Sequence, residues 1–367
     1  MKRAHIDRPL AILIAIHLLG GCMIFVSAAF GVLGRGFSSI TSVAFKHLVM
    51  GVGGGTVLLL IGMHIPYRNW RRFAPFIFGI ALIAMALVLV PGIGASHGGG
   101  QRWIIIAGVS FQPSEFLKIA SIFVAASYYA TIKAKAESLA WGVGGLIAIL
   151  AAPVIFLVLQ PDIGTLGIIC ISVVGVFFAA GARLRDMGVL LCVALIALSA
   201  LAYAKPHVRD RIVTFFHPAQ NQHAEGYQIT QSLIAVGSGQ LFGRGFGQGV
   251  QKFTYLPEAM GDSIFAVAAE ELGFVGSSII VLLFAGLALR GYAVAARAPD
   301  MFGALLAVGI STYLAGEAFI NIAAMLGVAP LTGVPLTFVS QGGSAMLISL
   351  ASAGILLNVS RHTAKGR

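Results

Sequence analysis

Ten long apolar stretches follow one another along this chain, and no other feature constrains its fold as strongly. Most of them reach the roughly 17–25 residues that an α-helix needs to cross a lipid bilayer. The sequence therefore predicts an all-α polytopic integral membrane protein with about ten transmembrane helices, in which residues 1–367 form a single domain. The stretches lie at 9–31, 45–65, 74–91, 115–132, 140–160, 163–181, 187–204, 262–289, 301–325 and 341–358.

The composition supports a membrane location, and the charge distribution indicates an orientation. Hydrophobic residues make up 58% of the chain and charged residues only 10%, whereas a soluble domain carries about a quarter charged residues. A net charge of +11 can indicate a nucleic-acid partner. Here, however, most basic residues of the short loops fall on one face, as the positive-inside rule describes. We predict both termini in the cytoplasm and no nucleic-acid partner.

Two loops on the predicted outer face break the regular alternation, at about 92–114 and 205–261. In the first loop, the apolar run Ile104–Val109 is too short to span, so we expect it to be re-entrant or to lie in the membrane interface. The second loop joins predicted helices 7 and 8 and is the largest extramembrane element. Within it, Tyr227–Leu241 has apolar residues at loosely helical spacing and is predicted to form an interfacial helix.

Acidic residues in and after the second loop are the first candidates for chemistry, because desolvating a carboxylate is costly. Asp262 follows a Pro257–Gly261 turn at the predicted start of the eighth span. It can act as an N-cap, which is the more common role and the one that spacing alone favours. It can also act as a general base whose pKa is raised by partial desolvation. Glu258 lies in the same turn.

Further charged residues lie at helix ends or inside apolar stretches. Glu115 and Lys118 share one helix face at i, i+3 spacing and form either a self-neutralising pair or a site where Lys118 reaches a lipid diphosphate. Asp162 is expected in an Asx turn. Glu270, Glu271 and Glu317 can hold helices together or carry protons. A cluster of basic residues in the two outer loops indicates an anionic, phosphate-bearing ligand; it comprises Arg102, Arg209, Arg211, Arg244 and Lys252.

Other common site patterns are absent from the sequence. The glycine run 237–249 lacks the strand that precedes a nucleotide-binding loop, so it predicts a flexible loop that grips an extended substrate. Cys22, Cys170 and Cys192 lie inside apolar stretches without disulfide or zinc spacing. The nine histidines show no metal-binding spacing, so no metal site is predicted.

Several motifs together resemble the SEDS family (shape, elongation, division and sporulation). They occur in family order over nearly the whole chain, and QKFTYLPEA with YQITQS ahead of it is more similar to the division branch than to the elongation branch. The motifs are QRWI (101–104), QPSEFLK (112–118), QPDIGT (160–165), YQITQS (227–232), QKFTYLPEA (251–259), EELGFVG (270–276) and FINIAAMLGVAPLTGVPLTFVSQGGSAML (319–347).

The resemblance implies a bacterial peptidoglycan glycosyltransferase that polymerises lipid II at the outer face of the cytoplasmic membrane. The acidic catalytic residue of the family lies in the motif PEAHTDFIF, and Asp262 occupies the matching position. This chain departs from the motif at Met260, Gly261 and Ser263, and Gln341 replaces the usual Tyr or His before GlyGlySer. The resemblance therefore implies activity, with altered support around the catalytic carboxylate.

A mechanism and partners follow from the same resemblance. Asp262 would deprotonate the acceptor sugar hydroxyl, which attacks the anomeric carbon of the donor chain and displaces undecaprenyl diphosphate with inversion. Basic side chains would stabilise the leaving diphosphate, and a divalent cation (Mg or Mn) could assist, although no ligand cluster demands one. The family works with a class B penicillin-binding transpeptidase and other divisome proteins. The substrate-binding residues predicted are Arg102, Glu115, Lys118, Asp162, Arg209, Arg211, Lys252 and Glu258.

Three alternatives remain open at this point. A lipid II flippase would use Glu115, Lys118 and Asp162 to guide the head group, and would depend on Glu317 more than on Asp262. An ion-coupled transporter would need repeat symmetry and broken helices around a midplane site, and the sequence shows little of either. A non-catalytic divisome scaffold is compatible with the altered neighbours of Asp262.

Overall fold

The computed structural model describes residues 6–31, 43–97, 100–106, 109–217 and 225–363. Long helices dominate this part of the chain. They are α1 (Arg8–Ala29), α3 (Gly54–His64, preceded by the π-helix η2, Lys46–Gly53), α4 (Tyr67–Val88), α5 (Pro113–Ile132), α6 (Gly144–Leu159, preceded by η3, Lys133–Glu137, and η4, Leu139–Val143), α7 (Ile163–Ala179), α8 (Leu184–Ala204), α12 (Ile264–Ala296), α13 (Met301–Met325) and α14 (Gly343–Arg361).

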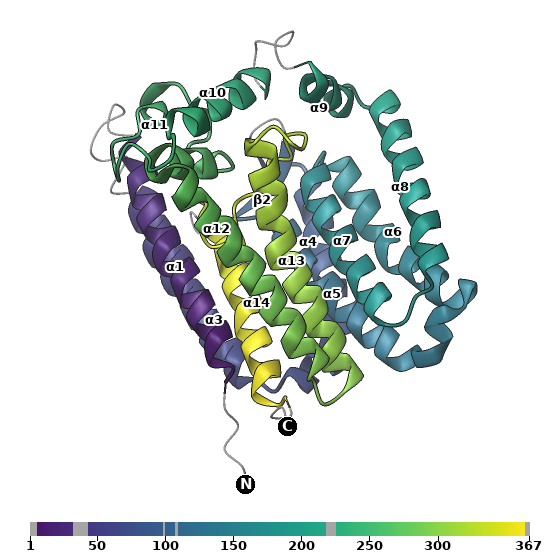
Figure 1. The fold of residues 1–367 in the computed structure, drawn as a ribbon. Helices are drawn as coiled ribbons and strands as arrows, with labels where there is room; N and C mark the ends of the chain where they lie inside the picture. The colour runs from purple at the N-terminus through teal and green to yellow at the C-terminus, as the bar shows by residue number, and fades with distance from the viewer. Residues whose placement is uncertain (1–5, 32–42, 98–99, 107–108, 218–224, 364–367) are drawn as a thin grey trace.

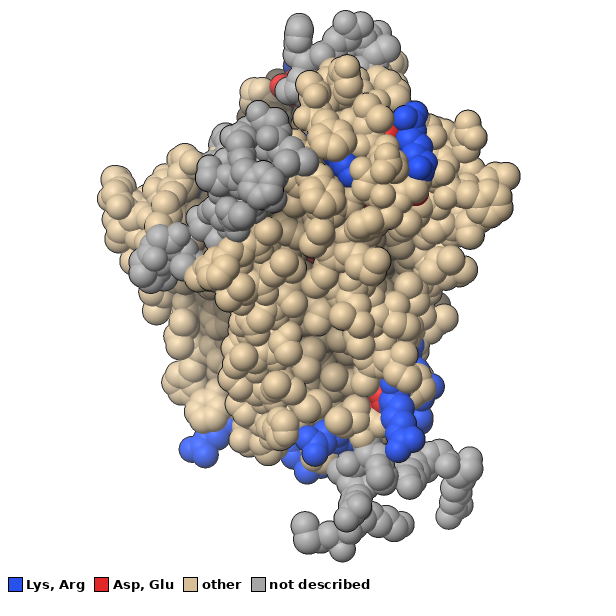
Figure 2. Space-filling model, turned by 90° about the vertical axis from the view of Figure 1, so that its left-hand side faces the viewer, with Lys and Arg blue, Asp and Glu red and all other residues tan. Residues whose placement is uncertain are grey.

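Each of the ten predicted spans corresponds to a helical segment. Within the described ranges, nine helical segments are long and apolar enough to cross a membrane, and α7 is a shorter apolar helix of 17 residues. Lys and Arg side chains gather towards the two ends of the face shown in Figure 2, and a broad band without Lys or Arg separates them. The prediction of a polytopic helical membrane protein is confirmed.

Three helices form the centre of the bundle. Most residues of α5, α13 and α14 are buried against other helices, whereas α8 buries only Asp186 and stands at the edge of the bundle (Figure 1). The start of α1 meets the end of α14, where the Asp7 N–H donates to Ser360 Oγ at 3.2 Å. The short helices α9 (Pro206–Phe216), α10 (Glu225–Ser238) and α11 (Gln251–Thr254) lie at the opposite end (Figure 1).

The first outer loop folds differently from the prediction. Its segments β1 (Gly94–His97), β2 (Gly100–Ile106) and β3 (Val109–Phe111) form an antiparallel sheet in the order β1-β2-β3. The described residues of Ile104–Val109 therefore lie in strands, and the fold is not purely helical. Their re-entrant or interfacial location in the membrane stays a prediction. The reason is local pairing: β-branched isoleucines favour strands, and Ile104 pairs with Gly94 on one side and Phe111 on the other.

The second outer loop contains the predicted helix. Tyr227–Leu241 was expected to be helical, and α10 covers Glu225–Ser238. The helix packs against α12, and its buried face includes Ile229, Ser232 and Ala235. This contact brings α10 close to the turn that precedes α12, where the candidate site lies.

Candidate active site

Asp262 lies in the turn before α12, and its position decides between the two roles considered above. The helix begins at Ile264, and its N-cap is Ser263, whose side chain makes no capping hydrogen bond. The N-cap interpretation of Asp262 is therefore wrong, because the turn continues one residue further than the apolar pattern suggested. The Asp262 carboxylate is half-buried, and it is not the N-cap of α12.

The surroundings of Asp262 raise the pKa of its carboxyl group to about 6. Burial is the largest cause, because it removes water from the charged form, and the nearby carboxylate of Glu258 adds repulsion. A hydrogen bond from Gln228 and the positive charge of Arg211 work in the opposite direction. A carboxylate with this pKa is a stronger base than an ordinary aspartate and is still ionised at neutral pH.

Two neighbouring segments complete the immediate surroundings of Asp262. Gln228 of α10 donates from Nε2 to Ser263 Oγ at 2.9 Å. Gly333, with a φ of +67°, lies across from the carboxylate, so that a methyl group on its Cα would be 3.9 Å from Asp262 Oδ2. Gln228 is thus bonded to the residue that follows Asp262, and Gly333 leaves room beside the carboxylate.

A polar cavity of about 550 Å³ lies beside this turn. Glu258 lines it with an exposed carboxylate and adopts a φ of +48°. Tyr227, Tyr255 and Gln341 also line it. The cavity thus presents a carboxylate, an amide and two aromatic rings next to the candidate base, and Glu258 remains a predicted substrate contact.

The predicted basic residues separate into two groups. Arg209 is exposed and Arg211 is half-buried on α9, and the charge of Arg211 acts directly on Asp262. Arg102 instead ties β2 to the turn between α6 and α7, where its Nε donates to Gln160 O at 3.0 Å and its Nη2 donates to Pro161 O. These hydrogen bonds indicate a structural role for Arg102, and the ligand contacts of Arg209 and Arg211 remain predictions.

Lys118 lies in the centre of the bundle. Its Nζ is 2.8 Å from Glu115 Oε2 and 2.9 Å from Glu317 Oε1, and all three side chains are at most 2% exposed. The self-neutralising pair predicted from spacing is confirmed, and Glu317 of α13 joins it. Lys118 does not extend to the membrane surface, so its predicted contact with a lipid diphosphate is not supported by the geometry.

Asp162 forms the predicted polar turn. It is the N-cap of α7 and accepts from the Thr165 N–H at 3.3 Å. Its Oδ2 also accepts from Ser114 Oγ at 3.1 Å and Gln112 Nε2 at 3.3 Å, which links α7 to the start of α5. These bonds account for the burial of Asp162, and its predicted contact with substrate remains a prediction.

Lys252 is enclosed in a cluster that we call the Lys252–Glu271 cluster (Ser27, Gly247, Lys252 and Glu271). The Lys252 Nζ lies 2.5 Å from Glu271 Oε1 and donates to Ser27 Oγ at 2.9 Å and Gly247 O at 3.1 Å. Ser27 Oγ donates in turn to Glu271 Oε2 at 2.6 Å. The ammonium group is thus engaged within the protein, at the wall of the polar cavity, and its predicted contact with a diphosphate remains a prediction.

The glycine run is held against α12 rather than left open. Glu270 accepts from the Val250 N–H at 2.9 Å and the Gln251 N–H at 3.2 Å, and Arg244 Nε lies 3.6 Å from its Oε1. Gly273 breaks the helical geometry of α12 with φ 67° and ψ −167°, a region that only glycine adopts readily. The predicted flexible grip on a substrate is therefore not the arrangement seen.

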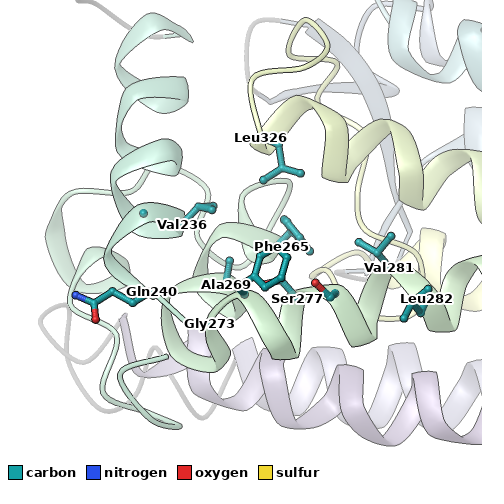
Figure 3. A pocket seen from close by; sticks show the side chains of 12 residues that line it. Val236, Gln240, Phe265, Ala269, Gly273, Ser277, Val281, Leu282 and Leu326 are labelled. Carbon is teal, nitrogen blue, oxygen red and sulfur yellow. The ribbon is translucent and has the colours of Figure 1, made fainter. Parts of the chain in front are cut away.

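An apolar groove of about 590 Å³ lies along α12 (Figure 3). It begins at Phe265, one turn after Asp262, and runs past Ala269 to Val281 and Leu282. Helix α10 and Leu326 form its other walls. The lining of this groove is mostly apolar, which suits an apolar ligand.

Sequence reasoning missed several residues that build the site. Gln228 and Asn321 lie inside quoted motifs, but neither was singled out, because an amide side chain carries no charge that marks it. Asn321 donates to the backbone carbonyl of Asp262 at 2.7 Å. Within the described ranges, no group of three or more His, Cys, Asp or Glu side chains is arranged to hold a metal ion.

Comparisons with known proteins agree with this architecture. The family model for FtsW, RodA and SpoVE, described as cell cycle protein, matches residues 8–365. Stage V sporulation protein E of Bacillus subtilis is 37% identical over 318 residues, which cover 87% of each chain. A probable peptidoglycan glycosyltransferase FtsW of Trichlorobacter lovleyi is 40% identical over 309 residues, which cover 83% of this chain and 80% of the relative.

Solved structures show the same fold. The rod shape determining protein RodA of Thermus thermophilus matches with a TM-score of 0.72 and 25% identity over 98% of both chains. A chain from a peptidoglycan synthase complex, studied for the coordination of polymerization and crosslinking, matches with a TM-score of 0.80 and 25% identity, covering 97% of this chain and 98% of that one. The relatives carry both division and sporulation names, so closeness to the division branch stays a prediction. The resemblance noted in the motifs is confirmed: this multi-pass bacterial membrane protein belongs to the FtsW, RodA and SpoVE (SEDS) family.

Proposed function

We propose that this protein is a peptidoglycan glycosyltransferase that polymerises lipid II at the membrane face opposite its termini. One observation supports the proposal most directly. Asp262 occupies the position of the family's acidic residue, lies half-buried in the turn before α12, and has a carboxyl pKa of about 6. The relatives named probable peptidoglycan glycosyltransferase FtsW support the same reaction class.

In the proposed mechanism Asp262 takes the proton from the sugar hydroxyl of the acceptor lipid II. The resulting oxygen nucleophile attacks the anomeric carbon of the donor strand. The bond from that carbon to the diphosphate oxygen breaks, and undecaprenyl diphosphate leaves with inversion at the anomeric carbon. No nucleotide is required, because the donor sugar already carries the diphosphate leaving group.

Two basic residues are the proposed groups that would stabilise the leaving diphosphate. Arg211 acts electrostatically on Asp262 and Arg209 is exposed on the same short helix, so both are suited to meet a diphosphate near the base. The apolar groove of Figure 3 starts one turn from Asp262 and suits a prenyl chain. A Mg²⁺ or Mn²⁺ ion would take most of its ligands from the diphosphate oxygens, since the described residues offer no ready cluster.

The proposed partner is a class B penicillin-binding transpeptidase, which would crosslink the strands that this protein makes. The similarity to a chain of a peptidoglycan synthase complex supports this pairing. Other divisome proteins remain expected partners through the family alone.

The experiment that tests the proposal is glycan-chain formation from lipid II by purified protein, with and without the cognate transpeptidase and with and without Mg²⁺. The variant is Asp262→Ala, and Asp210→Ala, an exposed carboxylate on α9, is the matched control. We expect chains from the wild type and the control and a loss of at least about 100-fold in Asp262→Ala, the usual scale for a general base. Equal output from Asp262→Ala would remove the base from the mechanism.

A lipid II flippase is the second candidate, because the bundle centre contains Lys118 with two carboxylates. A transporter would depend on these groups and not on Asp262. Lipid II translocation by proteoliposomes that form no glycan, abolished by Glu317→Gln but not by Asp262→Ala, would establish it. If the protein neither polymerises nor translocates lipid II, even with the transpeptidase present, the result favours a non-catalytic scaffold instead.

A further inference from the structure

The backbone that carries Asp262 is held by side chains from distant segments. Asn321, in the last two turns of α13, donates from Nδ2 to the Asp262 carbonyl at 2.7 Å. The same amide group donates to the Val334 carbonyl at 2.8 Å. One side chain therefore joins the turn before α12 to the segment that follows α13.

Two further hydrogen bonds fix the residues just before Asp262. Ser340 Oγ donates to the Gly261 carbonyl at 2.7 Å and accepts from the Leu336 N–H at 2.7 Å. The Gln341 N–H donates to the Met260 carbonyl at 2.7 Å. Three consecutive carbonyls, from residues 260 to 262, are thus engaged from one side. Fixing successive peptide planes also fixes the direction in which the Asp262 side chain leaves the backbone.

The burial of Asn321 shows that its amide is not there for packing alone. The residue is 1% exposed, and its Oδ1 has no hydrogen-bond partner within the described part of the chain. A buried polar atom without a partner destabilises the fold, and a leucine would fill similar space without this penalty. The two donors of the amide are the feature that an apolar residue cannot supply.

We propose that Asn321, assisted by Ser340, is a positioning residue that holds Asp262 at the correct distance and direction for proton abstraction. This inference rests on the proposed glycosyltransferase function. It also accounts for the altered motif: Gly261 lacks the hydroxyl that the family pattern has at this position, and here the backbone carbonyls of Gly261 and Asp262 are held from α13 and the segment after it.

The test compares two buried asparagines at opposite ends of the molecule. Asn321→Leu and Asn321→Asp remove the donors that reach Asp262. Asn358→Leu is the control, because Asn358 is 2% exposed, donates to the Met63 carbonyl at 2.7 Å and accepts from the Tyr67 N–H at 2.9 Å. The assay measures kcat and KM for lipid II polymerisation, together with hydrogen–deuterium exchange of the peptide that spans 258–266.

We expect both Asn321 variants to lose at least about tenfold in kcat while KM changes less than about twofold, since small displacements of a catalytic group cost one to two orders of magnitude in rate. Exchange in the 258–266 peptide should rise in these variants and stay unchanged in Asn358→Leu. Unchanged exchange at 258–266, or the same kcat for the Asn321 and Asn358 variants, would overturn the proposal. A silent wild type would reject the glycosyltransferase instead, and exchange would still decide whether Asn321 holds the turn.

Discussion

At the scale of single residues, the ionisation of Asp262 is the property on which the proposed reaction depends. A general base must be ionised at the working pH and basic enough to accept a proton, which places its best pKa close to that pH. Burial first and the nearby carboxylate of Glu258 second raise the pKa of Asp262, which reaches about 6. Gln228 and Arg211 keep the carboxylate charged above that value.

The pH profile of polymerisation should report this carboxyl group. Asp262 is deprotonated and active above about pH 6, and activity should fall as the pH drops through 6. The raised pKa places this fall at a higher pH than an ordinary aspartate would. Glu258→Gln removes a neighbouring negative charge, so it should lower the pKa of Asp262 and move the acid limb of log kcat to lower pH. An acid limb that stays in place would show that Glu258 does not act on the base.

The variant Gln228→Leu should change the pKa of Asp262 in the opposite direction. It removes a hydrogen bond that favours the ionised form of Asp262, so the acid limb of the same profile should move to higher pH. The two variants should therefore shift the limb in opposite directions. Shifts in the same direction would contradict the assigned electrostatics.

At the scale of elements, the Lys252–Glu271 cluster joins α1, the glycine run and α12. Both charged side chains are at most 4% exposed, and removing one member of a buried ion pair leaves the other charge uncompensated, at a cost of about 3–5 kcal/mol. Replacing both by neutral groups avoids the uncompensated charge. Comparing the single with the double replacement therefore tells whether Lys252 has a structural role or binds a ligand.

We expect Lys252→Met alone to lower the thermal stability and the activity of the purified protein. The double variant Lys252→Met with Glu271→Gln should recover most of the stability and part of the activity, because no buried charge is then left unpaired. Thermal unfolding in detergent and lipid II polymerisation measure the two effects. If the double variant regains stability but has no activity, Lys252 contacts substrate after all, as its basic charge first predicted.

The sequence predicted the helices better than it predicted the contacts between them. Continuous apolar runs define spans regardless of the partner, which is why each of the ten corresponds to a helical segment. The strand at Ile104 could not be predicted, since its pairing with Gly94 and Phe111 depends on contacts that an apolar run does not reveal. The sequence predicts diphosphate contacts for Lys118 and Lys252 because it shows their charge. It does not show their partners Glu317 and Ser27, which lie 199 and 225 positions away along the chain.

At the scale of the whole molecule, the face shown in Figure 2 carries its charged side chains towards the two ends, with few between them. The end that carries the chain termini also carries Arg68, Arg183 and Arg290, each paired with an acidic side chain. Asp262 and the polar cavity lie beyond the other end of α12. If the positive-inside rule holds, the termini face the cytoplasm and the proposed reaction takes place outside, where lipid II would have to be already translocated.

Thiol labelling in intact spheroplasts tests this orientation. In a variant with Cys22, Cys170 and Cys192 replaced by alanine, Gln248→Cys and Arg183→Cys place single exposed thiols at opposite ends. A membrane-impermeant maleimide should label Gln248→Cys in intact cells and Arg183→Cys only after permeabilisation. The reverse pattern would put Asp262 in the cytoplasm. The enzyme would then have to act on lipid II before translocation, and a crosslinking partner outside the membrane could not receive its product directly.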